Sequence, residues 1–147
     1  MREQTLDIAT RDGAMETFVV HPDRGAHPPV LLLMDAPGIR DELRDMARRL
    51  ATVGYYVMLP NLYYRAGRDT MYGPDVLTKG STEQERMRAV RTKMTIPPVM
   101  DDVAAMIAWQ MKVSIAPSLV AMSSVRSIIS RSPILRPVRI LLVFIQQ

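Results

Sequence analysis

The chain of 147 residues contains no cysteine, so disulfides, thiolate metal ligands and a cysteine nucleophile are excluded within it. Histidine is nearly absent as well. His21 and His27 flank the Pro- and Gly-rich stretch HPDRGAHPP, and no third metal-binding residue stands at helical spacing from either. Because a zinc site needs several such ligands together, we interpret both histidines as solvated loop residues. We expect no metal site at these histidines.

Aromatic residues make up only 5% of the sequence, and long apolar runs are missing. The longest run, Ile140 to Ile145, is far shorter than the roughly 20 residues that span a bilayer. The first residues are polar and fit neither a signal peptide nor an anchor. We therefore expect a cytoplasmic protein with no membrane partner. A pI near 9.8 favours nucleic acid, but the basic excess lies in the last part of the chain, without an RNA-binding signature or stacking aromatics, so we expect no nucleic-acid partner.

Two further absences divide the chain near Gln110. No glycine follows Gly80, and no acidic residue follows Asp102. Residues 1–110 carry 14 basic and 15 acidic residues, whereas residues 111–147 carry five basic residues, seven serines and no acid. We predict a nearly neutral first domain over residues 1–110 and an atypical basic, Ser-rich tail over residues 111–147. An abrupt change of this kind is typical of a shifted reading frame, which is our interpretation of the tail.

The first part alternates strand patterns with helix patterns. Residues 5–9 and 15–20 are joined across Arg11-Asp12-Gly13, a hairpin signal. Residues 30–34 (VLLLM) and 55–59 (YYVML) are continuous apolar runs, typical of strands covered on both faces. The residues between them, 39–53, predict an amphipathic helix whose apolar stripe is Ile39, Leu43, Met46, Ala47 and Leu50.

Two more helices are expected before the tail. Thr82-x-x-Glu85 is a capping box and predicts a helix to about Lys93. Pro97-Pro98 opens a second helix, with the stripe Val99, Val103, Met106 and Ile107. A strand–helix–strand unit beside a hairpin gives a mixed α/β sheet. Residues 138–145 can form a strand in the tail, although no turn residue marks it; without such a strand, a sheet edge would lie open.

Residues 30–67, VLLLMDAPGIRDELRDMARRLATVGYYVMLPNLYYRAG, resemble the dienelactone hydrolase family of the α/β-hydrolase fold. The matching features are a buried strand, an acid and a glycine in the loop after it, and the helix, strand and loop that follow. Asp101-Asp102-Val103 to Trp109 is also similar to the helix before that family's nucleophile strand. The likeness covers about residues 4–110. It implies an incomplete three-layer α/β-hydrolase-like sandwich with a mixed, mostly parallel sheet.

The resemblance also implies a lactone or ester hydrolase that uses no metal or cofactor. Its nucleophile, Cys or Ser, stands on a G-x-C/S-x-G elbow and is followed by an acid and a histidine. Ser123 and Ser124 lie near the expected position, but neither has flanking glycines, and no Asp, Glu or His follows them. If the chain is active, its partner is a small-molecule ester or lactone; with this triad missing, we expect no activity.

Four residues are candidates for site positions through the resemblance. Asp35 matches the acid after the family's third strand, and Ala36 matches the residue whose backbone N–H helps form the oxyanion hole. Turn chemistry before Pro-Gly explains both positions as well. Arg86 and Arg88 match the segment that binds a substrate carboxylate, with a solvated helix face as the competing explanation. The alternative function is a non-catalytic fragment or interaction module that associates through an exposed sheet edge, with a second copy of the chain as one candidate partner.

Overall fold

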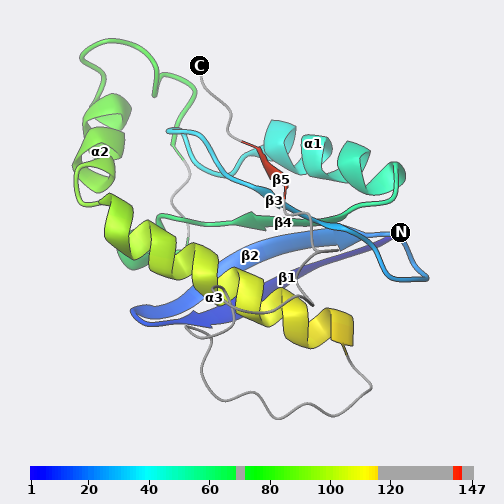
Figure 1. Ribbon diagram of the computed structural model, residues 1–147. Coiled ribbons are helices and arrows are strands. Elements are labelled where there is room, and N and C mark those ends of the chain that lie inside the picture. Colours follow the sequence, from blue (N-terminus) through cyan, green and yellow to red (C-terminus); the bar gives the residue numbers. More distant parts are fainter. Residues whose placement is uncertain (69–71, 116–140, 144–147) are drawn as a thin grey trace.

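The computed structural model describes residues 1–68, 72–115 and 141–143 (Figure 1). In chain order, the elements are β1 (Arg2–Thr10), β2 (Gly13–His21), β3 (Pro29–Leu32), α1 (Asp41–Thr52), β4 (Tyr56–Pro60), the 3-10 turn η1 (Tyr64–Ala66), α2 (Thr82–Arg91), α3 (Ile96–Ile115) and β5 (Leu141–Val143). None of the described helices is long and apolar enough to cross a membrane.

The predicted hairpin is formed by β1 and β2. The strands pair antiparallel from Arg2 opposite His21 to Thr10 opposite Gly13, so only Arg11 and Asp12 lie in the loop. Gly13 has φ +140°, a conformation that side-chain-bearing residues rarely adopt. The Asp-Gly signal therefore located the turn because the glycine supplies the backbone angle that the turn requires.

The described sheet has the strand order β1-β2-β4-β3-β5. β2 pairs antiparallel with β4, while β3 pairs parallel with β4 on one side and with β5 on the other. The mixed sheet is confirmed. Among the described strands, two pairings are antiparallel and two are parallel, because the hairpin extends through β4. β5 lies within the stretch 138–145 that can form a strand, and its pairing with β3 covers that edge of β3.

The sheet is covered on both faces, which gives the predicted three layers (Figure 1). Neighbouring residues of the inner strands point to opposite faces, as the pleat requires. Val19, Leu31 and Met58 pack on the side of α3, whereas Val20, Leu32 and Leu59 pack on the side of α1. Continuous apolar runs in β3 and β4 thus reflect burial on two sides at once.

Helix α1 buries most of the predicted stripe. Leu43 and Ala47 are buried against the sheet, with Ile39 and Leu50 packed beside them. Met46 is exposed, so its place in the stripe was wrong. Ala51 is buried instead, because it lies four residues after Ala47 on the same face of the helix.

The N-cap of helix α2 lies one residue before the predicted capping box. Ser81, not Thr82, is the N-cap: its hydroxyl accepts a hydrogen bond from the Gln84 backbone N–H at 3.1 Å. The Gln84 side chain in turn accepts from the Gly80 N–H at 3.0 Å. Serine and threonine are adjacent here, and both have a suitable acid or amide three residues on, so sequence alone does not separate them.

Helix α3 buries Val103 and Met106, with Val99 and Ile107 packed beside them, which confirms the predicted stripe. The helix continues without a break to Ile115. Gln110 therefore lies inside a helix and is itself buried.

The outer strand β1 carries charged side chains that pair with neighbouring segments. Glu3 accepts two hydrogen bonds from Arg48 of α1, at 2.8 and 2.9 Å, and Asp7 pairs with Arg68. Charged side chains of this kind discourage pairing with another sheet edge. Association through a sheet edge stays a prediction, and the charged side chains of β1 disfavour it at that edge.

The Glu3–Arg48 contact predicts a small pH dependence of stability. Hydrogen bonding to Arg48 holds the pKa of Glu3 below its ordinary value of 4.5. Its contribution is therefore present at pH 7 and is lost as the pH falls through the lowered folded-state pKa. We expect Glu3→Gln to be slightly less stable than the wild type at pH 7 and equal to it at pH 2 in urea unfolding. A difference that persists at pH 2 would assign the effect to packing.

Candidate functional site

A tight turn follows β3 at the carboxyl end of the strand. The Gly38 N–H donates to the Asp35 carbonyl at 3.0 Å, and Gly38 has φ +86°. Ligands of open α/β sheets bind outside the carboxyl ends of the strands. The buried apolar strand, followed after two further residues by Asp35-Ala36-Pro37-Gly38, thus places two of the candidate residues at the end of the sheet where such sites form.

The carboxylate of Asp35 is held by Arg40. One guanidinium nitrogen of Arg40 lies 2.5 Å from Oδ1 and another lies 2.7 Å from Oδ2. The Asp35 side chain is only 5% exposed, and hydrogen bonding to it raises the pKa of Arg40. This bidentate pair is a strong form of charge-assisted hydrogen bonding. Both carboxylate oxygens therefore already have a cationic partner on the same turn.

Ala36 is fixed through its carbonyl group. The hydroxyl of Tyr63 donates to the Ala36 carbonyl oxygen at 2.8 Å. Tyr63 is buried, and this burial is the main reason that its pKa is raised to about 12. The hydroxyl consequently stays protonated and remains a donor near neutral pH. The turn after β3 is thereby tied to the loop after β4, while the role of the Ala36 N–H in an oxyanion hole stays a prediction.

A hollow of about 220 Å³ lies beside this turn. One wall is the turn and the start of α1, and the other is the loop before α2. The residues that line it are Pro37, Ile39, Arg40, Tyr72, Gly73, Pro74, Val76 and Leu77. Pockets for drug-sized molecules usually measure about 300–1,000 Å³, so this hollow is smaller than that range and could hold only a small group.

The loop wall of the hollow is anchored to α2. Glu83 accepts a hydrogen bond from the Gly73 N–H at 2.8 Å. A Cβ atom at Gly73 would lie 3.0 Å from Asp75 Oδ1 and 3.3 Å from Glu83 Cγ. Glycine at this position therefore lets the loop approach the helix closely, and the hydrogen bond holds this wall of the hollow against α2.

The two candidate arginines of α2 do not line the hollow. Arg86 pairs with Glu83 at 2.8 Å, and its guanidinium lies 5.4 Å from the centre of the Tyr72 ring. Arg86 thus contacts a residue of the wall from outside. Arg88 is exposed. Their predicted role in binding a substrate carboxylate stays a prediction, and neither side chain lies in the lining beside Asp35.

The remaining sequence candidates lie elsewhere. His21 stacks on Tyr56 with ring centres 4.7 Å apart, and His27 contacts the Arg24 carbonyl at 2.8 Å. Within residues 1–68, 72–115 and 141–143, no three His, Cys, Asp or Glu side chains come together as a metal site would require. Ser123 and Ser124 lie outside the described residues.

One buried ionic cluster was not predicted. Asp102 of α3 is only 1% exposed, and it accepts hydrogen bonds from Arg65 at 2.8 and 3.0 Å and from the Tyr64 hydroxyl at 2.9 Å. Arg65 also bonds to Asp12 in the hairpin loop at 2.8 Å. The cluster joins three segments distant in sequence. Its one sequence signal is an acid at helical spacing among apolar residues, since Asp102 falls three residues after Val99.

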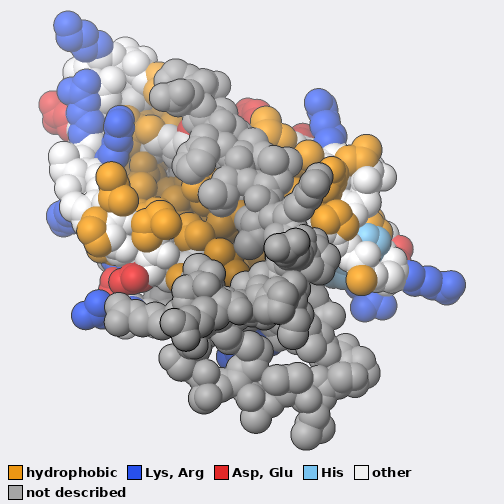
Figure 2. Space-filling model, viewed as in Figure 1, with side chains coloured by type: hydrophobic (Ala, Val, Ile, Leu, Met, Phe, Trp, Pro, Cys, Tyr) orange, Lys and Arg blue, Asp and Glu red, His pale blue; other side chains and the backbone are white. Residues whose placement is uncertain are grey.

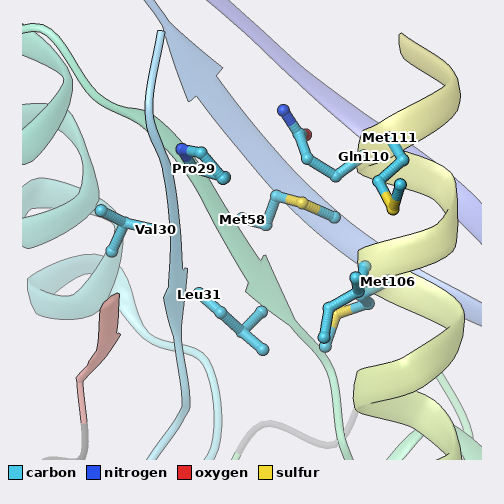
Figure 3. A pocket seen from close by; sticks show the side chains of 8 residues that line it. Pro29, Val30, Leu31, Met58, Met106, Gln110 and Met111 are labelled. Carbon is cyan, nitrogen blue, oxygen red and sulfur yellow. The ribbon is translucent and has the colours of Figure 1, made fainter. Parts of the chain in front are cut away.

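The opposite side of β3 and β4 carries a smaller apolar space. Figure 3 shows Leu31 and Met58 from these strands facing Met106 and Met111 of α3 across it. Its volume is only about 20 Å³, enough for little more than one water molecule. On the surface, Figure 2 shows hydrophobic side chains gathered around the first half of α3, and Ile96 and Met100 are exposed there.

Comparison with known proteins assigns the chain to a family. The model of the dienelactone hydrolase family matches residues 15–122. A protein of Methylorubrum extorquens, named as a candidate carboxymethylenebutenolidase, is 30% identical over 105 residues, which are 71% of this chain and 33% of that protein. A protein of Salmonella typhimurium with the same name is 42% identical over 62 residues, 41% of this chain and 23% of that protein.

The chain thus spans a third or less of the length of these curated relatives. Among solved structures, a candidate dienelactone hydrolase from Klebsiella pneumoniae superposes with a TM-score of 0.60 at 20% identity, over 76% of this chain and 44% of that one. This likeness confirms the α/β-hydrolase type of fold. The family match extends past Gln110, to residue 122. With nearly three quarters of its residues matched, the chain belongs to the dienelactone hydrolase family.

Proposed function

We propose that this chain carries the first half of an ester- or lactone-hydrolase site and does not complete a catalytic cycle alone. The observation that carries this proposal is the Asp35–Gly38 turn, held at the carboxyl end of β3 beside a hollow of about 220 Å³. Membership in the family supports the reaction class. In that reaction, a backbone N–H at Ala36 would stabilise negative charge on the carbonyl oxygen of the tetrahedral intermediate.

The chain lacks the residues that would carry out the chemical steps of this reaction. Ester hydrolysis by this type of site needs a nucleophile, a base that takes its proton and a group that orients the base. The chain has no cysteine, no histidine after His27 and no acid after Asp102. Asp35 is already paired with Arg40. Because a general base must be free to accept a proton, we do not assign this role to the paired Asp35.

We predict that the purified chain hydrolyses p-nitrophenyl acetate no faster than the same chain after treatment with a serine-reactive inhibitor. The assay follows release of p-nitrophenol at pH 7 and includes a single-turnover phase, because an acyl-enzyme would appear there as a burst. Turnover that is abolished by Ser123→Ala or by Ser124→Ala would contradict the proposal. Serine-to-alanine replacement at Ser81, which caps α2, serves as the control outside the expected nucleophile region.

The chain is also proposed to be a two-part polypeptide. The contrast in charge and glycine content between residues 1–110 and 111–147 supports this. The proposed boundary follows Gln110; helix α3, which runs to Ile115, and the family match, which runs to residue 122, both cross it. Translation of the coding DNA in its other two frames beyond codon 110 tests the frameshift interpretation. The interpretation fails if neither frame encodes a glycine-flanked Cys or Ser followed by Asp and His.

A further inference from the structure

Tyr63 contacts both of the segments that border the hollow. Its hydroxyl donates to the Ala36 carbonyl oxygen at 2.8 Å, and its ring meets the ring of Tyr72 edge-on, with ring centres 6.3 Å apart. Tyr72 belongs to the loop that forms the other wall. Tyr63 itself is only 3% exposed and is not among the lining residues. It therefore bridges the turn and the loop from outside the hollow.

The position of Tyr63 is set by the segments before and after it. Its backbone N–H donates to Asn61 Oδ1 at 3.0 Å, directly after β4. The next two residues, Tyr64 and Arg65, both bond to the buried carboxylate of Asp102 in α3. Because these contacts fix the backbone on both sides of the ring, the hydroxyl of Tyr63 has little freedom to move away from the turn.

The hydroxyl of Tyr63 holds one of the two peptide groups that meet at Ala36. The first group contains the Asp35 carbonyl and the Ala36 N–H, and its carbonyl accepts from the Gly38 N–H at 3.0 Å. A trans peptide is planar, so the Ala36 N–H points away from that bond. The second group contains the Ala36 carbonyl, for which Tyr63 is the only hydrogen-bond donor found within residues 1–68, 72–115 and 141–143. Each peptide group beside Ala36 is thus held by one hydrogen bond.

We propose that Tyr63 is a positioning residue of the hydrolase site: its hydroxyl fixes the backbone of Ala36 and, with it, the direction in which the Ala36 N–H would donate to a substrate oxygen. A backbone donor stabilises developing charge best when it is oriented beforehand. The identity of this donor rests on the proposed function, whereas the effect of Tyr63 on the turn rests on the contacts alone. The competing explanation is Pro37, because a proline restricts the backbone of the residue before it.

Tyr63→Phe tests the proposal, since it removes the hydroxyl and keeps the ring against Tyr72. The full-length chain is labelled with ¹³C and ¹⁵N. We expect the carbonyl ¹³C signal of Ala36 to shift, and the Gly38 amide hydrogen to exchange with solvent about fivefold faster, as the loss of one ordinary hydrogen bond predicts. The internal reference is the Gly54 amide, which donates to the Ala51 carbonyl at the same distance of 3.0 Å and also has a positive φ. Its exchange is expected to stay unchanged.

Tyr56→Phe is the matched control. Tyr56 is buried like Tyr63, but it pairs with Pro29 at the opposite end of β3 from the turn. We expect this variant to change neither the Ala36 carbonyl signal nor the exchange of Gly38. Unchanged signals in Tyr63→Phe would overturn the proposal, and so would equal changes in the two phenylalanine variants or an equal acceleration at Gly54.

A third variant tests the competing explanation. Pro37→Ala lifts the restriction on Ala36 and leaves the Tyr63 hydroxyl in place, so the exchange of Gly38 is expected to accelerate less than in Tyr63→Phe. A larger acceleration in Pro37→Ala would show that the proline, rather than Tyr63, fixes the turn. None of these measurements involves turnover. Hydrolysis by the chain would contradict the proposed function and leave the role of Tyr63 in the turn standing, whereas unchanged signals would overturn that role without affecting the hydrolysis assay.

Discussion

Replacement of Arg65 by methionine is expected to lower the free energy of unfolding by about 3–5 kcal/mol at pH 7. The substitution keeps the unbranched aliphatic stem but removes two of the hydrogen bonds that reach Asp102, which is buried in α3. Of the hydrogen bonds described above, the carboxylate would keep the one from the Tyr64 hydroxyl. Its charge would then lie in the interior without a counterion. Urea denaturation followed by circular dichroism measures the loss.

Two comparisons separate charge from bulk. Arg49→Met changes an exposed arginine of α1 and is expected to alter stability by no more than about 0.5 kcal/mol. The double variant Arg65→Met with Asp102→Leu removes both charges, and it is expected to be more stable than Arg65→Met alone, because two apolar groups can replace a buried pair at little cost. A double variant that is less stable than either single variant would show that packing, rather than the unpaired charge, dominates.

Replacement of Met106 by alanine is expected to cost about 2–5 kcal/mol. Met106 is 1% exposed and borders the small apolar space between α3 and the sheet. Truncation would enlarge that space into an apolar cavity that stays empty of water. The matched control is Met100→Ala, the same substitution on the same helix at a side chain that is 58% exposed, with an expected change within about 0.5 kcal/mol.

The Met106→Ala cavity also provides a check that does not depend on the size of the loss. A dry apolar cavity binds small apolar molecules, so saturating benzene should raise the melting temperature of Met106→Ala and not that of Met100→Ala. Equal losses in the two alanine variants, or equal stabilisation by benzene, would show that Met106 does not anchor α3 to the sheet as its burial indicates.

Local patterns were enough to predict most of the fold. The Asp-Gly pair marks the hairpin, and the continuous apolar runs of β3 and β4 reflect their burial on both faces. What escaped prediction depends on contacts between distant segments. The Arg65–Asp102 pair joins residues 37 positions apart, and no helix or strand periodicity in the sequence predicts it. Pairing of β5 with β3 likewise joins residues that are far apart in sequence, such as Val30 and Leu141.

The candidate site also combines features that local sequence predicts with features that depend on contacts between separate segments. Asp35 and Ala36 were identified because a strand followed by an acid, proline and glycine is a local pattern. The pairing of Asp35 with Arg40 requires the turn to bring positions five apart within 2.5 Å, which depends on the positive φ of Gly38. The hollow requires a loop some 35 positions further along the chain to return beside that turn, so nothing in the local sequence predicts its lining.

The pairing of β3 with β5 determines which part of the sheet opens most easily. It joins Val30 to Leu141, more than 100 positions apart, through only three pairs of residues, whereas the hairpin pairs nine neighbouring residues on each strand. Loop-closure entropy grows with this separation, by about 0.6 kcal/mol for each doubling. Amide hydrogens of β5 should consequently exchange with solvent by local opening, well before those of β2 and β4. Any partner that adds a strand to β3 must therefore wait for this opening, and its association rate would be limited by the small fraction of molecules that are open at a given moment.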